Sequence, residues 1–149
     1  MERALENLRK YPLEERLHLE KICHDELSDL YMLCKDKRAE EQIGQCIDLH
    51  RKWLAMDDRF ERPHRDTTGY MMRAYAKMVY LRDLISRDKL NEYYQKCIGL
   101  ARARGDMAEI YSTSARYYQC TGDYERAVAY IDSTITAYKS KGIKADLAP

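Results

Sequence analysis

The sequence has few residues that interrupt helices and no pattern of covalent cross-links. It contains only three prolines and six glycines among 149 residues, which leaves room for long helices. Its five cysteines are an odd number and lack the close paired spacing of a zinc knuckle or a disulfide framework. We expect reduced core cysteines, which favours a reducing compartment. The cysteines are Cys23, Cys34, Cys46, Cys97 and Cys120.

Long apolar runs and an excess of one charge are also missing. No stretch approaches the ~18–20 apolar residues that span a bilayer, and the N-terminal stretch lacks the apolar core of a signal peptide. The net charge is +1, and lysine and arginine form no long block. A nucleic-acid-binding protein normally carries a basic stripe that neutralises phosphates. We therefore expect this segment neither to insert into a membrane nor to bind nucleic acid.

Catalytic motifs are absent as well. There is no Gly-x-Gly-x-x-Gly, no phosphate loop and no Gly-x-Ser-x-Gly. Cys23, His24 and Asp25 are suitable residue types, but consecutive helical residues point about 100° apart and cannot converge. His18 and His24 lie on different faces of the same expected helix, and no Glu-x-x-His pairs supply metal ligands. We expect no enzymatic activity, no cofactor and no metal site.

Helical periodicity is clearest near the C-terminus. Apolar residues recur at helical spacing over 107–120 and again over 124–139. Between them, Gly122 can end one helix and Asp123 can cap the next. Two amphipathic helices with so short a link must pack antiparallel. We expect core or inter-repeat packing from a tyrosine stripe comprising Tyr111, Tyr118, Tyr124, Tyr130 and Tyr138.

A second helical pair is predicted 34 residues upstream. Moving the frame back by this amount gives helices over 68–86 and 88–104, joined at Asp88 and Lys89. A two-helix period of 34 residues is the length of a tetratricopeptide repeat (TPR).

Segment 108–141 resembles the TPR family in its key positions. The matching residues are Tyr111, Ala115, Tyr118, Gly122, Tyr124 and Ala127. The resemblance implies that Ala115 and Ala127 let the two helices approach closely. Segment 74–107 is only TPR-like, because Leu81 and Tyr93 replace the small residues. The implied fold is all-α, a right-handed superhelix of antiparallel helical hairpins.

The predicted organisation is a single TPR-like array over 1–149 with about three hairpins. These span about 13–56, 68–104 and 107–139, and the first is linked near 35–37. The charged stretch 57–67 contains Pro63 and is expected to be either a solvated connector or a partner-specific insertion. Residues 2–10 are expected to be the remains of an earlier helix, and 143–149 the start of a truncated one. A repeat array needs a polar cap on its last unit, so we expect an excerpt from a longer protein.

The candidate binding residues follow from the resemblance, in which the first helix of each hairpin lines a concave groove. In the last repeat these are Glu109, Ser112, Arg116 and Gln119, and one period earlier Tyr75, Met78, Arg82 and Ile85. Arg82 and Arg116 are 34 residues apart and are expected to stack. Two guanidinium groups suit a carboxylate, so we expect a protein or peptide partner with an acidic group. The alternative is a solvated face, with intramolecular partners such as Asp29 or Glu109.

The phrases Leu-Ala-Arg-Ala-Arg-Gly-Asp (100–106) and Gly-Asp-Tyr-Glu-Arg-Ala (122–127) resemble the TPR sensor segments of bacterial two-component histidine kinases. This implies a non-catalytic, protein-binding sensory or input region located outside the inner membrane, in the periplasm. The alternative is a freestanding TPR adaptor or assembly factor in the cytoplasm. An uncapped array is also expected to self-associate.

Overall fold

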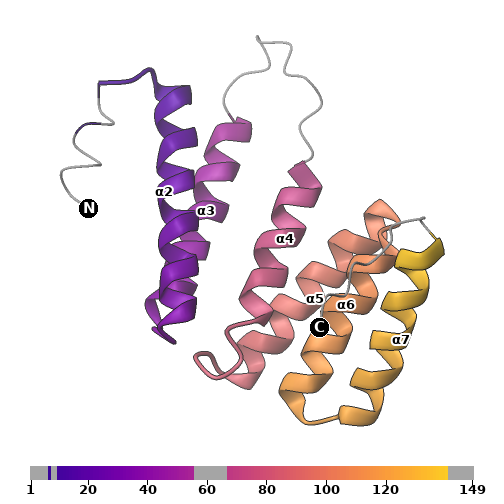
Figure 1. Cartoon of the computed structure of the whole chain (residues 1–149). Helices are drawn as coiled ribbons and strands as arrows, with labels where there is room; N and C mark the ends of the chain where they lie inside the picture. Colours follow the sequence, from indigo (N-terminus) through magenta and orange to yellow (C-terminus); the bar gives the residue numbers. More distant parts are fainter. Residues whose placement is uncertain (1–6, 8–9, 56–66, 141–149) are drawn as a thin grey trace. The chain divides into compact units, whose positions relative to one another are not determined.

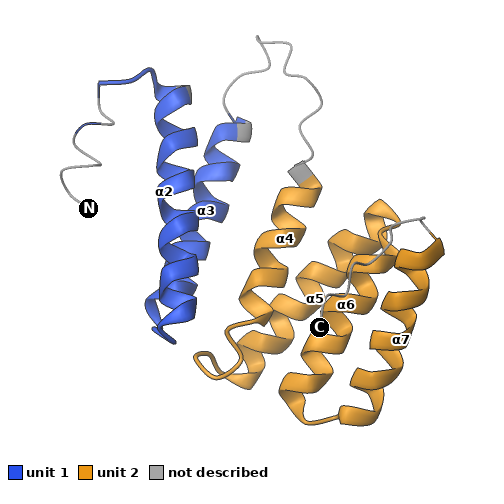
Figure 2. Ribbon diagram, in the orientation of Figure 1, with its two compact units in different colours: residues 1–65 blue, residues 66–149 orange. Residues whose placement is uncertain are grey.

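The computed structural model describes residue 7 and residues 10–55 and 67–140. Within these ranges the regular secondary structure is entirely α-helical, which confirms the all-α prediction (Figure 1). The chain divides into two compact units, 1–65 and 66–149, and each is described by itself (Figure 2). The expected helical remnant over 2–10, the body of the connector 57–67 and the expected start of a helix at 143–149 lie outside the described residues.

Unit 1 contains a helical hairpin of α2 (Leu13–Leu33) and α3 (Arg38–Ala55). The predicted link near 35–37 is confirmed. Lys35 adopts a left-handed conformation with φ of 53°, and the Asp36 carboxylate accepts a hydrogen bond from the Arg38 backbone N–H at 2.9 Å. The Arg38 guanidinium also binds this carboxylate, and these bonds lower the pKa of Asp36 to about 2. The link is therefore closed by its own side chains.

The interior of unit 1 contains the chain's single tryptophan. Trp53 packs with Leu17 and Leu49 in an apolar cluster. The ring of His50 stacks on Trp53 with 5.7 Å between ring centroids. Burial lowers the pKa of His50 to about 4, because a buried imidazole loses the hydration that favours its charged form.

Unit 2 contains four helices: α4 (Thr67–Val79), α5 (Arg87–Arg104), α6 (Met107–Thr121) and α7 (Tyr124–Ser140). Helices α4 and α5 form one hairpin and α6 and α7 another, and α6 also packs against α5 and touches α4. The shared core comprises Val79, Leu90, Tyr94 and Ile98. The helices expected over 68–86 and 107–120 thus share a packed layer.

Tyrosine rings join three helices of unit 2. Tyr94 of α5 stacks on Tyr117 of α6, with 4.1 Å between centroids and 8° between planes. Tyr118 of α6 stacks on Tyr130 of α7, with 5.5 Å between centroids and 4° between planes. Tyr117 and Tyr118 meet edge to face. This continuous run of rings supplies most of the aromatic contact between neighbouring helices.

Two short links in unit 2 agree with the sequence prediction. Gly105 and Gly122 end α5 and α6 with φ of 67° and 83°, a conformation that favours glycine. Asp106 caps α6 by accepting from the Glu109 backbone N–H at 3.2 Å. Asp123 caps α7 in the same way through the Arg126 N–H. The predicted turn at Gly122 and Asp123 is confirmed.

The link between α4 and α5 corrects the prediction. The helix expected over 68–86 ends at Val79, and turns follow it, closed by bonds such as Leu84 N–H to the Leu81 carbonyl. Ser86 is the N-cap of α5 and accepts from the Lys89 N–H. The link expected at Asp88 and Lys89 is therefore wrong, because both residues lie inside α5. Helices α4 and α6 begin at Thr67 and Met107, and α5 and α7 begin at Arg87 and Tyr124, so both pairs of helices are offset by more than 34 residues.

Candidate functional site

A groove on unit 2 brings together three of the predicted binding residues. It has a volume of about 240 Å³ and lies between α6 and α7, beside the end of α4. We call it the Arg116 groove. Its lining residues are Tyr80, Ser112, Ala115, Arg116, Gln119, Ile131, Thr134 and Ile135.

Helix α6 places its polar residues in the groove through simple periodicity. Ser112, Arg116 and Gln119 are separated by four and three residues and share one helical face. Residues Thr113 and Ser114 on another face are buried. The α6 side of the groove therefore depends on the register of this helix, which begins after the Asp106 cap and ends at Gly122.

Arg116 is half-buried and held by two contacts. Its Nη1 donates to Gln119 Oε1 at 3.1 Å, and its guanidinium carbon lies 4.4 Å from the centroid of the Tyr80 ring. Among the described residues no carboxylate pairs with Arg116. An arginine has five N–H donors, so the groove holds an oriented cation with capacity for an acidic ligand.

Arg82 lies outside the groove lining. It is an exposed residue of the link after α4, and its Nε contacts Asp83 Oδ2 at 3.3 Å. Both guanidinium groups act on the half-buried thiol of Cys120. Burial raises the pKa of Cys120, and the positive charges of Arg82 and Arg116 partly oppose this rise.

The remaining candidates lie outside the groove lining. Tyr75 and Met78 on α4 are buried, with 6% and 3% of their surfaces exposed, and the Tyr75 ring stacks on Tyr93. Glu109 accepts a hydrogen bond from the Thr113 hydroxyl at 2.7 Å. It is therefore engaged with its own helix, and no ion pair joins it to Arg116 among the described residues.

Sequence reasoning missed the apolar part of the groove. Ile131 and Ile135 belong to the helical periodicity over 124–139, yet they are 48% and 37% exposed. The packing expected of the tyrosine stripe is also wrong for Tyr124, which is 67% exposed. Tyr80 was placed inside a helix, whereas it begins the link after α4.

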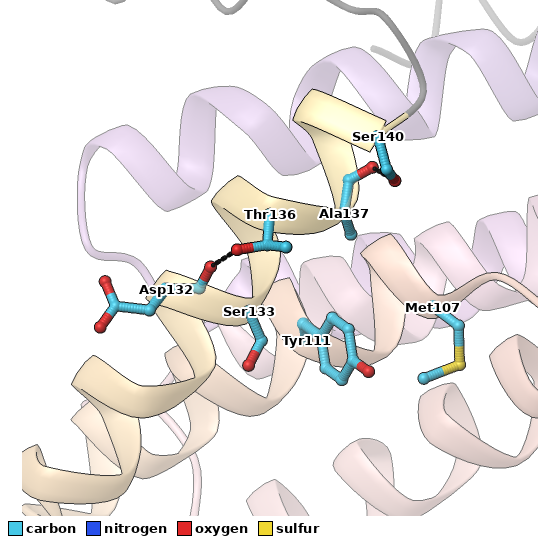
Figure 3. Close-up of a pocket in the computed structure, with 7 residues that line it drawn as sticks. All are labelled: Met107, Tyr111, Asp132, Ser133, Thr136, Ala137 and Ser140. Carbon is cyan, nitrogen blue, oxygen red and sulfur yellow. Dashed lines mark hydrogen bonds between the residues drawn. The ribbon is translucent and has the colours of Figure 1, made fainter.

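A second groove lies along the same pair of helices (Figure 3). Its volume is about 480 Å³. The hydroxyls of Ser133, Thr136 and Ser140 donate to carbonyls of their own helix, and Asp132 contributes the carboxylate. These three hydroxyls therefore already donate their hydrogen atoms within the helix. Its lining residues are Met107, Tyr111, Asp132, Ser133, Thr136, Ala137 and Ser140.

Neither a metal cluster nor a membrane-spanning helix is found in the ranges that the structure describes. No protein-family model matches the sequence, and no curated protein or solved structure is significantly similar to it.

Proposed function

We propose that unit 2 is a TPR-like helical-repeat module that binds a protein or peptide segment carrying an acidic group. The observation that carries this proposal is the Arg116 guanidinium, oriented over Tyr80 in a partly apolar groove. Arginine binds a carboxylate with two parallel hydrogen bonds, which gives both affinity and orientation.

The packing of unit 2 supports the TPR-like architecture. Each hairpin pairs consecutive helices, α5 packs on α6, and the first helices of the two hairpins touch. Ala115 and Ala127, the small residues of the TPR resemblance, are 7% and 4% exposed. Gly122 ends α6 in the left-handed conformation that the short turn requires. We propose that these hairpins follow the right-handed superhelical course of TPR arrays.

The groove also offers apolar contact and a low ordering cost. Ile131 and Ile135 provide exposed apolar surface beside Arg116, as in binding sites that combine an apolar lining with a few polar groups. Tyr80 and Gln119 hold the arginine before a ligand arrives. Less side-chain entropy is then lost on binding.

A peptide array with acidic, neutral and basic sequences tests this function. We expect the wild-type chain to prefer acidic peptides and Arg116→Ala to bind the best of them about tenfold more weakly. Arg102→Ala is the matched control, because Arg102 is an exposed arginine in α5 outside the groove. Equal affinities of wild type and Arg116→Ala for every selected peptide would refute the role of Arg116.

We further propose that this module is the sensory or input region of a bacterial two-component signalling protein, which places it in the periplasm. The support is the resemblance of segments 100–106 and 122–127 to the TPR sensor segments of such proteins. A freestanding cytoplasmic adaptor or assembly factor is the second candidate, favoured by the five reduced cysteines. A membrane span and a kinase core encoded after residue 149 would decide for the first, and a nearby stop codon for the second.

A further inference from the structure

Helix α7 carries a row of exposed apolar residues, which we call the α7 stripe. These residues are alternately four and three positions apart, so they share one side of the helix. Scattered exposed apolar residues are ordinary, but a continuous row marks an interaction surface. The stripe comprises Tyr124, Val128, Ile131, Ile135 and Tyr138, with exposed fractions of 67%, 57%, 48%, 37% and 37%.

Three of the five stripe positions, those of Ile131, Ile135 and Tyr138, are covered in α5, whereas the α5 residues equivalent to Tyr124 and Val128 are exposed. Ser86 caps α5 and Asp123 caps α7, each by accepting from the backbone N–H three residues later. Counted from these caps, Ile98 of α5 is equivalent to Ile135 of α7. Ile98 is 3% exposed, whereas Ile135 is 37% exposed.

Helix α6 provides the cover on α5. The ring of Tyr117 stacks on Tyr94, and the Ser114 hydroxyl meets the Tyr94 hydroxyl at 3.1 Å. Cys97 of α5 donates weakly to the hydroxyl of Thr113. Tyr94 is 9% exposed, while Ile131, at the equivalent position of α7, is 48% exposed.

Helix α6 packs on a surface formed by α4 and α5, which we call its seat. Besides the α5 contacts, Cys120 of α6 lies 4.0 Å from the Val79 carbonyl of α4. An α-helix thus lies against both members of the preceding hairpin. The Arg116 groove is the corresponding space on the next hairpin, because α6 and α7 both line it.

We propose that the Arg116 groove and the α7 stripe together bind an amphipathic α-helix of a partner protein, seated as α6 is seated on α4 and α5. The inference rests on the proposed function and names the form of the partner. The docking face of this helix carries an aliphatic, two small and one aromatic residue at the spacing of Ile110, Thr113, Ser114 and Tyr117. An acidic residue of the partner pairs with Arg116.

Charge favours a partner protein over a second copy of this chain. The stripe is flanked by Arg116 on the groove side and by the exposed carboxylate of Asp132 on α7. In a twofold antiparallel pairing centred on Ile131, residues at the centre meet their own copies. Arg116 would then face arginine and Asp132 would face aspartate, which is unfavourable. A helix with an acidic residue towards Arg116 avoids this repulsion.

The test uses synthetic helical peptides built on the sequence 106–121, with Cys120→Ser to prevent oxidation. One peptide carries Arg116→Glu and is acidic, and the other carries Glu109→Lys and is basic. Fluorescence anisotropy measures their affinity for the full chain. We expect the acidic peptide to bind about tenfold more tightly than the basic one, and Arg116→Ala in the protein to abolish this difference.

Variants of the stripe locate the binding surface. Ile131→Asp and Val128→Asp in the protein are expected to weaken binding of the acidic peptide about tenfold or more. Leu33→Asp is the matched control, because Leu33 is 82% exposed but belongs to unit 1. Hydrogen exchange on the wild-type chain is expected to show protection of 124–138 when the peptide is added. Protection confined to other segments, or binding unaffected by Ile131→Asp and Val128→Asp, would overturn the proposal.

Two further experiments distinguish failure of this inference from failure of the proposed function. A peptide with Thr113→Pro cannot form a continuous helix and is expected not to bind. If it binds equally and Arg116→Ala still weakens it, the helical form is wrong while the proposed function stands. Because like charges would meet in a pairing of two copies, this proposal replaces the expectation of self-association, and sedimentation of the wild-type chain should show a monomer. A dimer dissociated by Ile131→Asp, or tighter peptide binding by Leu147→Asp, would assign the seat to a second copy or to residues 141–149 instead.

Discussion

At the scale of single residues, the site depends on how one cation is held. Arg116 is attached to the groove by Tyr80 and Gln119, and neither of these neutralises its charge. Arg116 can therefore still bind a carboxylate, because both of its neighbours are uncharged. The aromatic ring orients the guanidinium without competing for its N–H donors.

Removing the Tyr80 ring should weaken binding without altering the fold. Tyr80 is 52% exposed, so Tyr80→Ala leaves the core intact. We expect a two- to fivefold loss of affinity for the acidic peptide, roughly the value of an exposed cation–π contact. Tyr80→Phe keeps the ring and is expected to bind like wild type. A Tyr80→Phe variant as weak as Tyr80→Ala would show that the hydroxyl, not the ring, matters.

The cysteines should differ sharply in reactivity. Burial raises the pKa of the Cys97 thiol to about 11, whereas Cys34 is exposed. Since only the thiolate reacts, iodoacetamide at about pH 8 should modify Cys34 and leave Cys97 unmodified in the folded chain. Mass spectrometry of the digested protein measures both sites. Modification of Cys97 at the rate of Cys34 would mean that α5 opens readily.

At the scale of helices, local signals predicted starts and ends where they were strong. Gly122 with Asp123 and the link near Asp36 were recognised because glycine and aspartate perform distinct steric and hydrogen-bonding tasks there. The end of α4 was missed because Leu81 continues the apolar spacing and is 1% exposed although it lies in a turn. Apolar periodicity in a sequence reflects which residues are buried. A buried residue in a turn can therefore extend the apolar spacing beyond the end of a helix.

Two glycines of unit 2 should respond oppositely to alanine. Gly122 has φ of 83°, so Gly122→Ala forces a side chain into a strained conformation and should cost about 1 kcal/mol. Gly99 lies inside α5, and an added Cβ meets nothing within 4 Å. Gly99→Ala should therefore stabilise the chain by about 0.5–1 kcal/mol. Urea unfolding followed by circular dichroism measures both, and stabilisation by Gly122→Ala would contradict the observed cap.

At the scale of the whole molecule, the sequence indicated the helical class and part of the lining of the Arg116 groove. It placed Ser112, Arg116 and Gln119 on one face of a helix, and all three line the Arg116 groove, since their positions depend only on the register of α6. It did not find Tyr80 beside them, because that contact depends on where α4 ends and how it meets α6. Contacts between helices belong to the tertiary structure, and they cannot be predicted from the length of a sequence repeat alone.

Unit 1 should lose stability in acid because of His50. The pKa of His50 is about 4 in the folded chain and 6.5 for the free side chain, so the unfolded chain takes up a proton first as the pH falls. Stability of unit 1 should be complete above about pH 6.5 and should decline towards pH 4. Trp53 fluorescence during urea unfolding reports this, because Trp53 stacks on His50. His50→Gln should flatten the slope, and the exposed His18→Gln should not.

The run of tyrosine rings in unit 2 has an optical consequence. Tyr94 with Tyr117, and Tyr118 with Tyr130, form nearly parallel pairs whose centroids are 4.1 and 5.5 Å apart. Electronic transitions of rings this close are coupled, so their near-ultraviolet circular dichroism depends on the relative tilt of α5, α6 and α7. Any event that shifts α7 by a fraction of a ring width would therefore be visible in the spectrum of the unlabelled protein.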